Sequence, residues 1–206
     1  MTTPTHRLVI IRHGETDWSA EGRHTGSTDL PLNATGVSQA ASLAAVVDAL
    51  DMQGEVTVLA SPRARAQRTA QLAGLTVSRT EPDLGEWDYG DYEGITSAEI
   101  HRTVPDWTVW THGGPDGESP EQIAARADRV LAEAAVALER GDVVLVGHGH
   151  FGAALTARYL QAPISFGRHF HVLPASATVL AYDAHGVPQL RAFGRTGYAS
   201  ESYAGR

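Results

Sequence analysis

The sequence predicts an α/β protein built on an open, mostly parallel sheet. Three strand-like apolar runs, at 7–12, 56–60 and 143–146, are each followed by a segment with helical periodicity. Strands buried on both faces of a parallel sheet have such continuous apolar runs, and their alternation with helices is typical of this class. A length of 206 residues fits one domain, which we expect to span residues 1–206.

The first strand, 7–12, contains four consecutive apolar residues and ends shortly before Gly14. From Asn33, an expected N-cap, small and apolar residues recur at helical spacing up to Leu50. The sequence therefore predicts a strand followed by an amphipathic helix.

The second strand, 56–60, is followed directly by Ser61 and Pro62. A serine N-cap with proline at the first helical position is a frequent helix start. We therefore expect a helix to begin here and to reach about Leu72.

The segment 82–117 differs from the rest of the chain because it is rich in Gly, Trp, Tyr and Asp. It offers at most a short helix, near 97–103. We therefore expect it to be an insertion within the single domain that lies over the active site.

A long helix is predicted after this segment. Ser119 and Gln122 form a capping box around Pro120, and apolar residues trace one helical face from Ile123 to Leu138.

The last part of the chain completes the sheet. A helix at 153–160 should follow the buried strand 143–146. The runs 177–182 and 189–193 flank Gly186 and predict a hairpin at the sheet edge.

Composition excludes several classes of protein and of chemistry. The 16 basic residues are scattered among 24 acidic ones, for a net charge of −8, which argues against binding to nucleic acid. No apolar run approaches the roughly 20 residues that cross a bilayer, and no secretory signal is evident, so the expected location is the cytoplasm. Cysteine and lysine are both absent, which removes thiolate nucleophiles, cysteine-ligated zinc and Schiff-base catalysis.

Two histidines directly follow buried strands. His13 stands in Arg-His-Gly after the first strand, and His148 stands in Gly-His-Gly after the third. Open α/β sheets bind ligands at the carboxyl ends of their strands, so we expect the two histidines to lie together. The neighbouring Arg12 favours phosphate chemistry, because a guanidinium matches phosphate oxygens and a neutral imidazole can attack phosphorus.

Four motifs, in this order along the chain, resemble the histidine phosphatase superfamily, which includes cofactor-dependent phosphoglycerate mutase. They are R-H-G-E-T at 12–16, S-P-x-x-R-A-x-x-T-A at 61–70, L-x-E-x-x-x-G-x-x-E-G at 84–94 and G-H-G at 147–149. The resemblance covers about residues 7–195. It implies a phosphoglycerate mutase-like fold, a three-layer α/β/α sandwich with a mostly parallel central sheet.

The resemblance also implies roles for five residues. His13 would be the nucleophile, Arg12, Arg65 and His148 would complete the phosphate pocket, and Glu86 would be the general acid. The substrate-binding residues that it implies are Arg12, Ser19, Thr25, Gly26, Arg65, Glu86, His148 and Gly149.

For Arg65 and Glu86, the alternative to a role in the site is an ordinary place on the solvated surface. Arg65 lies in a basic stretch with Arg63 and Arg68 that could be a solvated helix face, but only Arg65 occupies the arginine position of the motif. Glu86 lies in an acidic run that would by default be solvated surface. Its aromatic neighbours would desolvate the carboxyl group, as an acid catalyst near neutral pH requires.

A metal site is the alternative role for His148 and His150, which could form half of one with carboxylates. No H-E-x-x-H or similar metal spacing is present. We therefore expect neither a metal nor another cofactor.

Two features, the scarcity of basic residues and the residues after Glu86, favour hydrolysis over mutase chemistry, and Ser19 is a further departure from mutases. Arg102 is the only basic residue between Glu86 and Ser119, so this segment offers little to hold a second anionic group. The Arg-His-Tyr that follows the acid in mutases is replaced by Trp-Asp-Tyr at 87–89, and Ser19 stands where mutases carry asparagine. The alternatives are a cofactor-dependent phosphoglycerate mutase and, more remotely, a non-catalytic binding protein on the same fold.

Several loop motifs resemble the sedoheptulose-bisphosphatase-like branch and related bacterial acid phosphatases. They lie at 18–19, 25–32, 86–94 and 147–150. The expected partner is a small phosphorylated metabolite, a sugar phosphate or bisphosphate. The sequence leaves the oligomeric state open, a homodimer included.

Overall fold

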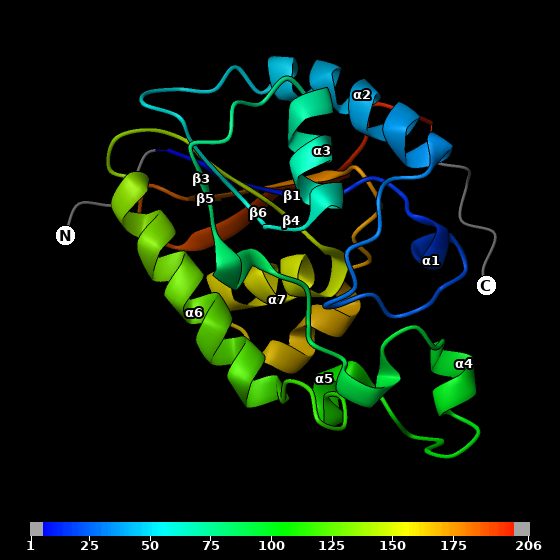
Figure 1. Cartoon of the computed structure of the whole chain (residues 1–206). Helices are drawn as coiled ribbons and strands as arrows, with labels where there is room; N and C mark the ends of the chain where they lie inside the picture. Colours follow the sequence, from blue (N-terminus) through cyan, green and yellow to red (C-terminus); the bar gives the residue numbers. More distant parts are fainter. Residues whose placement is uncertain (1–5, 200–206) are drawn as a thin grey trace.

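A six-stranded sheet lies between two layers of helices in this computed structural model, which describes residues 6–199 (Figure 1). The strand order is β3-β2-β4-β1-β5-β6; the first four are mutually parallel, and β5 and β6 form an antiparallel hairpin at one edge. The predicted three-layer α/β/α sandwich is thus confirmed. The strands are β1 Leu8–Arg12, β2 Thr57–Ala60, β3 Arg79–Thr80, β4 Val143–Gly147, β5 Ala177–Tyr182 and β6 Pro188–Arg195.

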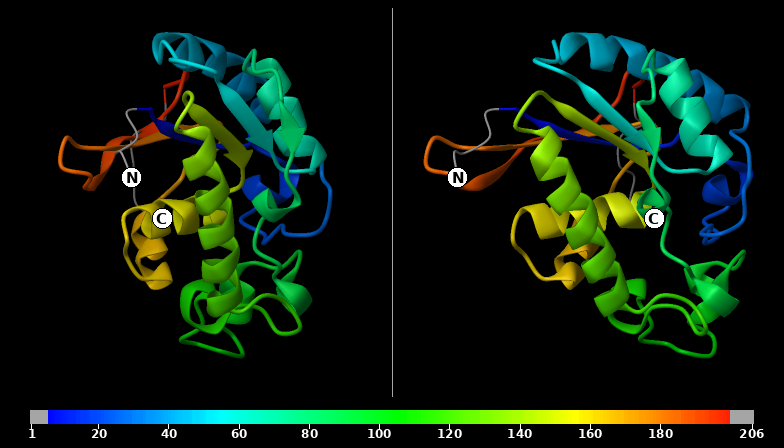
Figure 2. Two further views of the ribbon diagram at one scale, coloured as in Figure 1. Left: turned by 90° about the vertical axis from the view of Figure 1, so that its left-hand side faces the viewer. Right: turned by 60° about the vertical axis from the view of Figure 1, so that its left-hand side comes forward.

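Helices α2 and α3 cover one face of the sheet, and α6 and α7 cover the other (Figure 2). None of the helices in the described part of the chain is long and apolar enough to cross a bilayer. The α-helices are α1 Asp17–Ala20, α2 Ala34–Ala49, α3 Ala64–Leu72, α4 Ser97–Ile100, α5 Val109–His112, α6 Pro120–Ala137 and α7 Gly149–Tyr159. The 3₁₀ turns are η1 Pro82–Leu84, η2 Gly90–Tyr92 and η3 Ile164–His169.

The alternation of side chains along β1 divides the core into two layers. Leu8 and Ile10 belong to the cluster beneath α6 and α7, whereas Val9 and Ile11 belong to the cluster beneath α2 and α3. All four are at most 2% exposed, which explains why the strand reads as one continuous apolar run.

Two helix starts differ from the prediction. α3 begins at Ala64, and its N-cap Arg63 makes no side-chain capping bond, so Ser61 is not the cap. The Oγ of Ser61 instead contacts His148, as described below. α7 begins at Gly149, four residues before the predicted start at 153. The capping box at the start of α6 is confirmed.

The segment 82–117 lies beyond the carboxyl ends of the parallel strands (Figure 1). It carries the expected short helix α4 and also α5, which the sequence did not predict. Trp87, Trp107 and Trp110 are each less than 10% exposed and join the core cluster of α6 and α7. This aromatic packing holds the segment against the rest of the molecule.

Candidate active site

A cavity of about 310 Å³ opens at the carboxyl ends of β1 and β4. Its wall is assembled from five parts of the chain: the end of β1, α1 with the stretch that follows it, the segment 82–117, the start of α7, and residues 170–172. The lining residues are Arg12, His13, Ser19, Gly22, Arg23, His24, Thr25, Glu86, Tyr89, Ser97, Gly149, His150, Phe170, His171 and Val172.

His13 is held in one tautomer by its own loop. Its Nδ1 lies 2.6 Å from the carbonyl oxygen of Gly14, which can only accept, so Nδ1 carries the proton and Nε2 carries the lone pair. Burial, with the nearby charges of Arg12 and Arg65, lowers the pKa of His13 well below its usual value. His13 is therefore a neutral imidazole that presents an unprotonated Nε2 on the cavity wall.

Arg12 lies beside His13 in the sequence and has unused hydrogen-bonding capacity. Its Nη1 donates to the carbonyl oxygen of Val172 over 2.6 Å, whereas its Nε is buried without a hydrogen-bond partner. A Cβ on Gly149 would lie 3.3 Å from the Arg12 guanidinium, so the glycine allows this close packing. A buried, unpaired N–H on a cation at a cavity wall favours the binding of an oxyanion.

Arg65 lies behind the cavity wall and is fully buried. Its Nη1 donates to the carbonyl oxygen of Thr28, and its Nη2 donates to those of Thr25 and Gly26, over 2.8 to 3.2 Å. Its Nε donates to Nδ1 of His148 over 3.3 Å. Arg65 therefore orders the loop 25–28, orients His148, and contributes a positive charge close to His13.

His148 adopts the tautomer opposite to that of His13. Because Nδ1 accepts from Arg65, Nε2 carries the proton and donates to the Oγ of Ser61 over 2.8 Å. Burial lowers the pKa of His148 well below its usual value. The ring centroids of His13 and His148 are 5.1 Å apart, so the two strand-end histidines lie together as expected.

Ser61 is a site residue whose role the sequence interpretation missed. The serine was assigned to a helix N-cap, although it also opens the S-P-x-x-R-A motif. The place of Ser61 in that motif is the sequence signal that could have identified it as a residue of the site.

Glu86, from the segment 82–117, lies against the first turn of α7. Its Oε1 accepts from the backbone amides of Trp87 (2.9 Å) and Phe151 (2.8 Å), and its Oε2 accepts from that of His150 (3.0 Å). These bonds fix the carboxylate on the cavity wall, next to the helix N-terminus. Of its aromatic neighbours, Tyr89 lines the cavity and Trp87 packs into the core.

The remaining predicted binding residues divide into two groups. Ser19 and Thr25 line the cavity, and the Oγ of Ser19 donates to the carbonyl oxygen of Thr16 over 2.9 Å. Gly26 does not line it; its amide donates to the Glu93 carboxylate over 2.9 to 3.0 Å. Gly26 thus supports the loop that holds Arg65.

A cluster of rings on the wall was not predicted. Tyr89 Oη lies 2.6 Å from Nδ1 of His150, and the His24 ring centroid lies 4.7 Å from that of Tyr89. Burial lowers the pKa of both His24 and His150 to about 4, so both imidazoles are neutral near pH 7. The loop motif at 147–150 contains His150, whereas no motif of the sequence contains His24. Within residues 6–199, no three His, Cys, Asp or Glu side chains are grouped to hold a metal ion.

Comparison with known proteins identifies the family. The chain is 44% identical to an acid phosphatase of Mycobacterium tuberculosis over 205 residues, which cover 100% of both chains. It is 30% identical over 223 residues to the sedoheptulose 1,7-bisphosphatase of Saccharomyces cerevisiae, covering 93% of this chain and 80% of the yeast protein. The solved structure of the open reading frame Rv3214 from Mycobacterium tuberculosis matches with a TM-score of 0.92 and 45% identity, covering 94% of this chain and 100% of that one.

The family model described as "Histidine phosphatase superfamily (branch 1)" matches residues 8–196, nearly the whole chain. That match includes the strand-end histidines and the acidic segment that line or support the cavity. The chain therefore belongs to branch 1 of the histidine phosphatase superfamily.

Proposed function

We propose that the protein hydrolyses phosphomonoesters of small metabolites through a phosphohistidine formed on His13. The observation that carries this proposal is the Nδ1 contact of His13 with the Gly14 carbonyl, which leaves a neutral Nε2 as the nucleophile. Arg12 would hold the phosphoryl oxygens with its unpaired Nε. Arg65 and His148 would complete the phosphate pocket from behind.

The reaction takes two steps. Nε2 of His13 attacks phosphorus, a P–N bond forms, and the P–O bond to the leaving group breaks as Glu86, which starts the cycle in its protonated form, gives its proton to the leaving oxygen. A water molecule then attacks phosphorus, the P–N bond breaks, and Glu86 takes the proton of that water. Inorganic phosphate leaves, and both side chains return to their starting states.

The size of the cavity supports a small substrate. A volume of about 310 Å³ lies at the lower end of the range of ligand pockets, roughly 300 to 1,000 Å³. The names of the relatives, an acid phosphatase and a sugar bisphosphatase, agree with phosphate monoesters of this size. We favour sugar phosphates or bisphosphates, without a metal or other cofactor, in the cytoplasm. A homodimer remains open.

The segment 82–117 supports the same assignment, because it contributes Glu86, Tyr89 and Ser97 to the cavity wall. We propose that it is an insertion within one domain, and that it shapes the space for the leaving group.

A competition experiment tests phosphatase against mutase chemistry. Purified protein is supplied with 3-phosphoglycerate and the bisphosphate cofactor, and 2-phosphoglycerate and free phosphate are followed in one reaction. In parallel, phosphate release is measured across sugar mono- and bisphosphates. We expect hydrolysis to dominate. Isomerisation that exceeds the best rate of phosphate release by tenfold would assign the protein to the mutases.

A further inference from the structure

We propose that Arg23 forms a second oxyanion-binding subsite on the active-site wall, which selects phosphomonoesters whose leaving group carries another phosphate or a carboxylate. This inference rests on the proposed function and specifies its substrate class.

The charges on the cavity wall direct attention to Arg23. Arg12 and Arg23 are the arginines among its lining residues, and Glu86 is the carboxylate. The other basic side chains on the wall are imidazoles. Burial lowers the pKa of His24 and His150 to about 4 and lowers that of His171 as well. With Arg12 assigned to the transferred phosphoryl group, Arg23 is the side chain of this wall that carries a permanent positive charge for the rest of the substrate.

The backbone around Arg23 pairs with residues 94–96 in a short antiparallel arrangement, called the rim below. Arg23 and Thr96 form an isolated antiparallel β-bridge. The amide of His24 donates to the carbonyl of Ile95 over 3.0 Å, and the amide of Gly94 donates to the carbonyl of His24 over 2.8 Å. Arg23 Nη1 also donates to the Gly94 carbonyl over 3.2 Å. The guanidinium is therefore placed before substrate arrives, which reduces the entropy cost of holding an anion.

In the absence of substrate, the Arg23 guanidinium forms an ion pair with Glu21 that a substrate anion can replace. Arg23 Nε donates to Glu21 Oε2 over 2.6 Å, and the side chains of Arg23 and Glu21 are 44% and 55% exposed. An ion pair so exposed contributes little stability. An anionic group on a bound substrate would therefore compete with Glu21 for the guanidinium at small cost.

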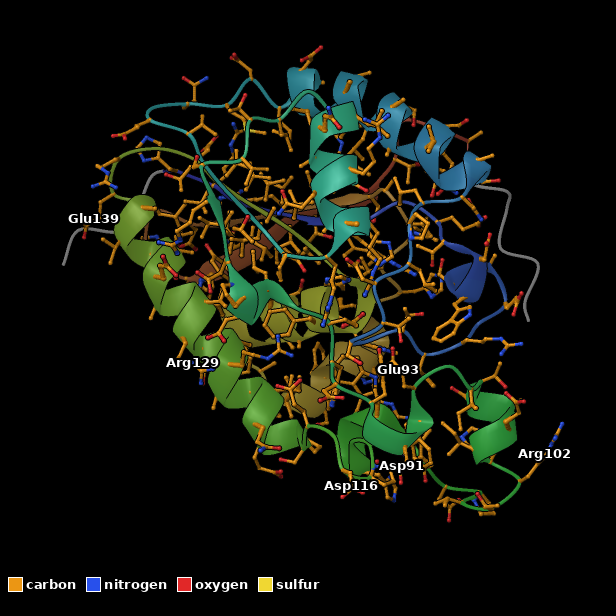
Figure 3. The ribbon with its side chains drawn as sticks, in the orientation of Figure 1. Asp91, Glu93, Arg102, Asp116, Arg129 and Glu139 are labelled. Atoms are coloured by element: carbon orange, nitrogen blue, oxygen red, sulfur yellow. The ribbon has the colours of Figure 1, made fainter. Side chains whose placement is uncertain are left out.

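The position of Arg23 also changes the argument drawn from the sequence. Between Glu86 and Ser119 the sequence carries a single arginine, Arg102. Arg102 is exposed, does not line the cavity, and points away from the molecule beside α4 (Figure 3). The cation comes instead from the stretch after α1, which lies far from this segment in sequence and is joined to it by the rim.

Matched substrate pairs test the subsite. 3-Phosphoglycerate and glycerol 3-phosphate differ by a carboxylate in place of a hydroxymethyl group, and fructose 1,6-bisphosphate and fructose 6-phosphate differ by a phosphate. The ratio of kcat/KM within each pair measures the preference for the second anion and identifies which anion is preferred. p-Nitrophenyl phosphate reports phosphatase activity independently of any second anion.

We expect the wild type to prefer the anionic member of at least one pair. Arg23→Gln should lower that ratio about tenfold or more, because a charge-assisted contact to the substrate is lost. Arg23→Lys should retain part of the preference. Glu21→Gln should raise the ratio, because it removes the competitor for the guanidinium. Arg102→Gln, the matched control, should leave the ratio unchanged.

The kcat/KM ratio should fall in Arg23→Gln and rise in Glu21→Gln. These opposite changes distinguish a role in substrate binding from a structural role. Equal losses on both members of each pair in Arg23→Gln, or a wild type without preference, would overturn the subsite while leaving the phosphatase assignment intact. If Arg23→Gln does not fold, Glu21→Gln and Arg23→Lys decide the question. Failure of the wild type to hydrolyse p-nitrophenyl phosphate would overturn the proposed function, and the subsite with it.

Discussion

At the scale of single residues, two histidines in similar sequence contexts have opposite tautomers. Both follow a buried strand and precede a glycine, but Nδ1 of His13 faces the Gly14 carbonyl whereas Nδ1 of His148 faces the Arg65 guanidinium. A hydrogen-bond acceptor facing Nδ1 keeps the ring proton on that nitrogen, whereas a donor facing Nδ1 leaves the proton on Nε2. The neighbours therefore decide which nitrogen carries the lone pair that can attack. Of these two histidines, His13 combines an unprotonated Nε2 with a place on the cavity wall, whereas Nε2 of His148 donates to Ser61.

Replacement of His13 should therefore abolish the covalent step. We expect His13→Ala to lower kcat by on the order of 10⁴ or more, as loss of a nucleophile does. Acid-labile phosphate bound to the protein, trapped by denaturation during turnover, should be present in the wild type and absent from the variant. The exposed His185, changed to Ala, is the matched control. A His13→Ala protein with a tenth of the activity would remove His13 from this role.

The effect of Glu86→Gln should depend on the leaving group. With an alkyl phosphate the loss should be about 10² to 10⁴, the range of general acid catalysis, because an alkoxide needs a proton to leave. With p-nitrophenyl phosphate the loss should shrink, since nitrophenolate leaves unaided. The exposed neighbour Asp88, changed to Asn, should not alter the ratio between the two substrates. Equal losses on both substrates would rule out Glu86 as the acid.

At the scale of elements, the acidic segment 86–94 is hydrogen-bonded to the loop 25–28. Glu93 accepts the amides of Gly26 and Thr28 over 2.9 to 3.0 Å, and the carbonyls of that loop accept from Arg65. Glu93 therefore acts on the site by positioning Arg65. By contrast, Asp91 of the same run is exposed; Figure 3 labels both residues.

Glu93→Gln should weaken both the fold and catalysis. It replaces a charged acceptor of two amides by a neutral one, which costs on the order of 2 kcal/mol of unfolding free energy. We also expect kcat/KM to fall, because Arg65 loses its ordered partners. Thermal unfolding and kcat/KM measured together check this, with Asp91→Asn as the control. Wild-type values of both quantities in Glu93→Gln would contradict the positioning role.

At the scale of the whole molecule, folding keeps several histidines neutral. Burial lowers the pKa of His24 and His150 to about 4 and that of His13 and His148 well below 6.5. In the unfolded chain these groups titrate near 6.5, so below that pH the unfolded state binds protons that the folded state does not. Above pH 6.5 these imidazoles are neutral in both states and do not oppose folding. As the pH falls from 6.5 toward 4, proton binding by the unfolded state lowers the free energy of unfolding.

The free energy of unfolding should consequently fall between pH 6.5 and pH 5.0, above the range in which most carboxylates titrate. Urea unfolding at several pH values measures this slope. His24→Asn should flatten the slope because one buried imidazole is removed, whereas His185→Asn at the exposed turn should preserve it. A free energy that stays constant or rises as the pH is lowered through this window would contradict the prediction.

The features that the sequence determined by itself are local or repeated. Continuous apolar runs define β1, β2 and β4 because strands buried on both faces have no polar side. The capping box at Ser119 sets the start of α6 because its donors and acceptors lie within three residues. The pairing of His13 with His148 follows from the shared edge of parallel strands.

The tertiary structure decided what depends on partners far away in the chain. α7 starts at Gly149, where Glu86 accepts amides of its first turn, and α3 starts at Ala64, after Ser61, whose hydroxyl contacts His148. The two-residue strand β3 exists only as a partner of β2. Arg23 and the ring cluster reach the site because the cavity wall is assembled from five separate segments. No local spacing encodes such contacts, since long-range packing sets both their geometry and the desolvation that keeps the histidines neutral.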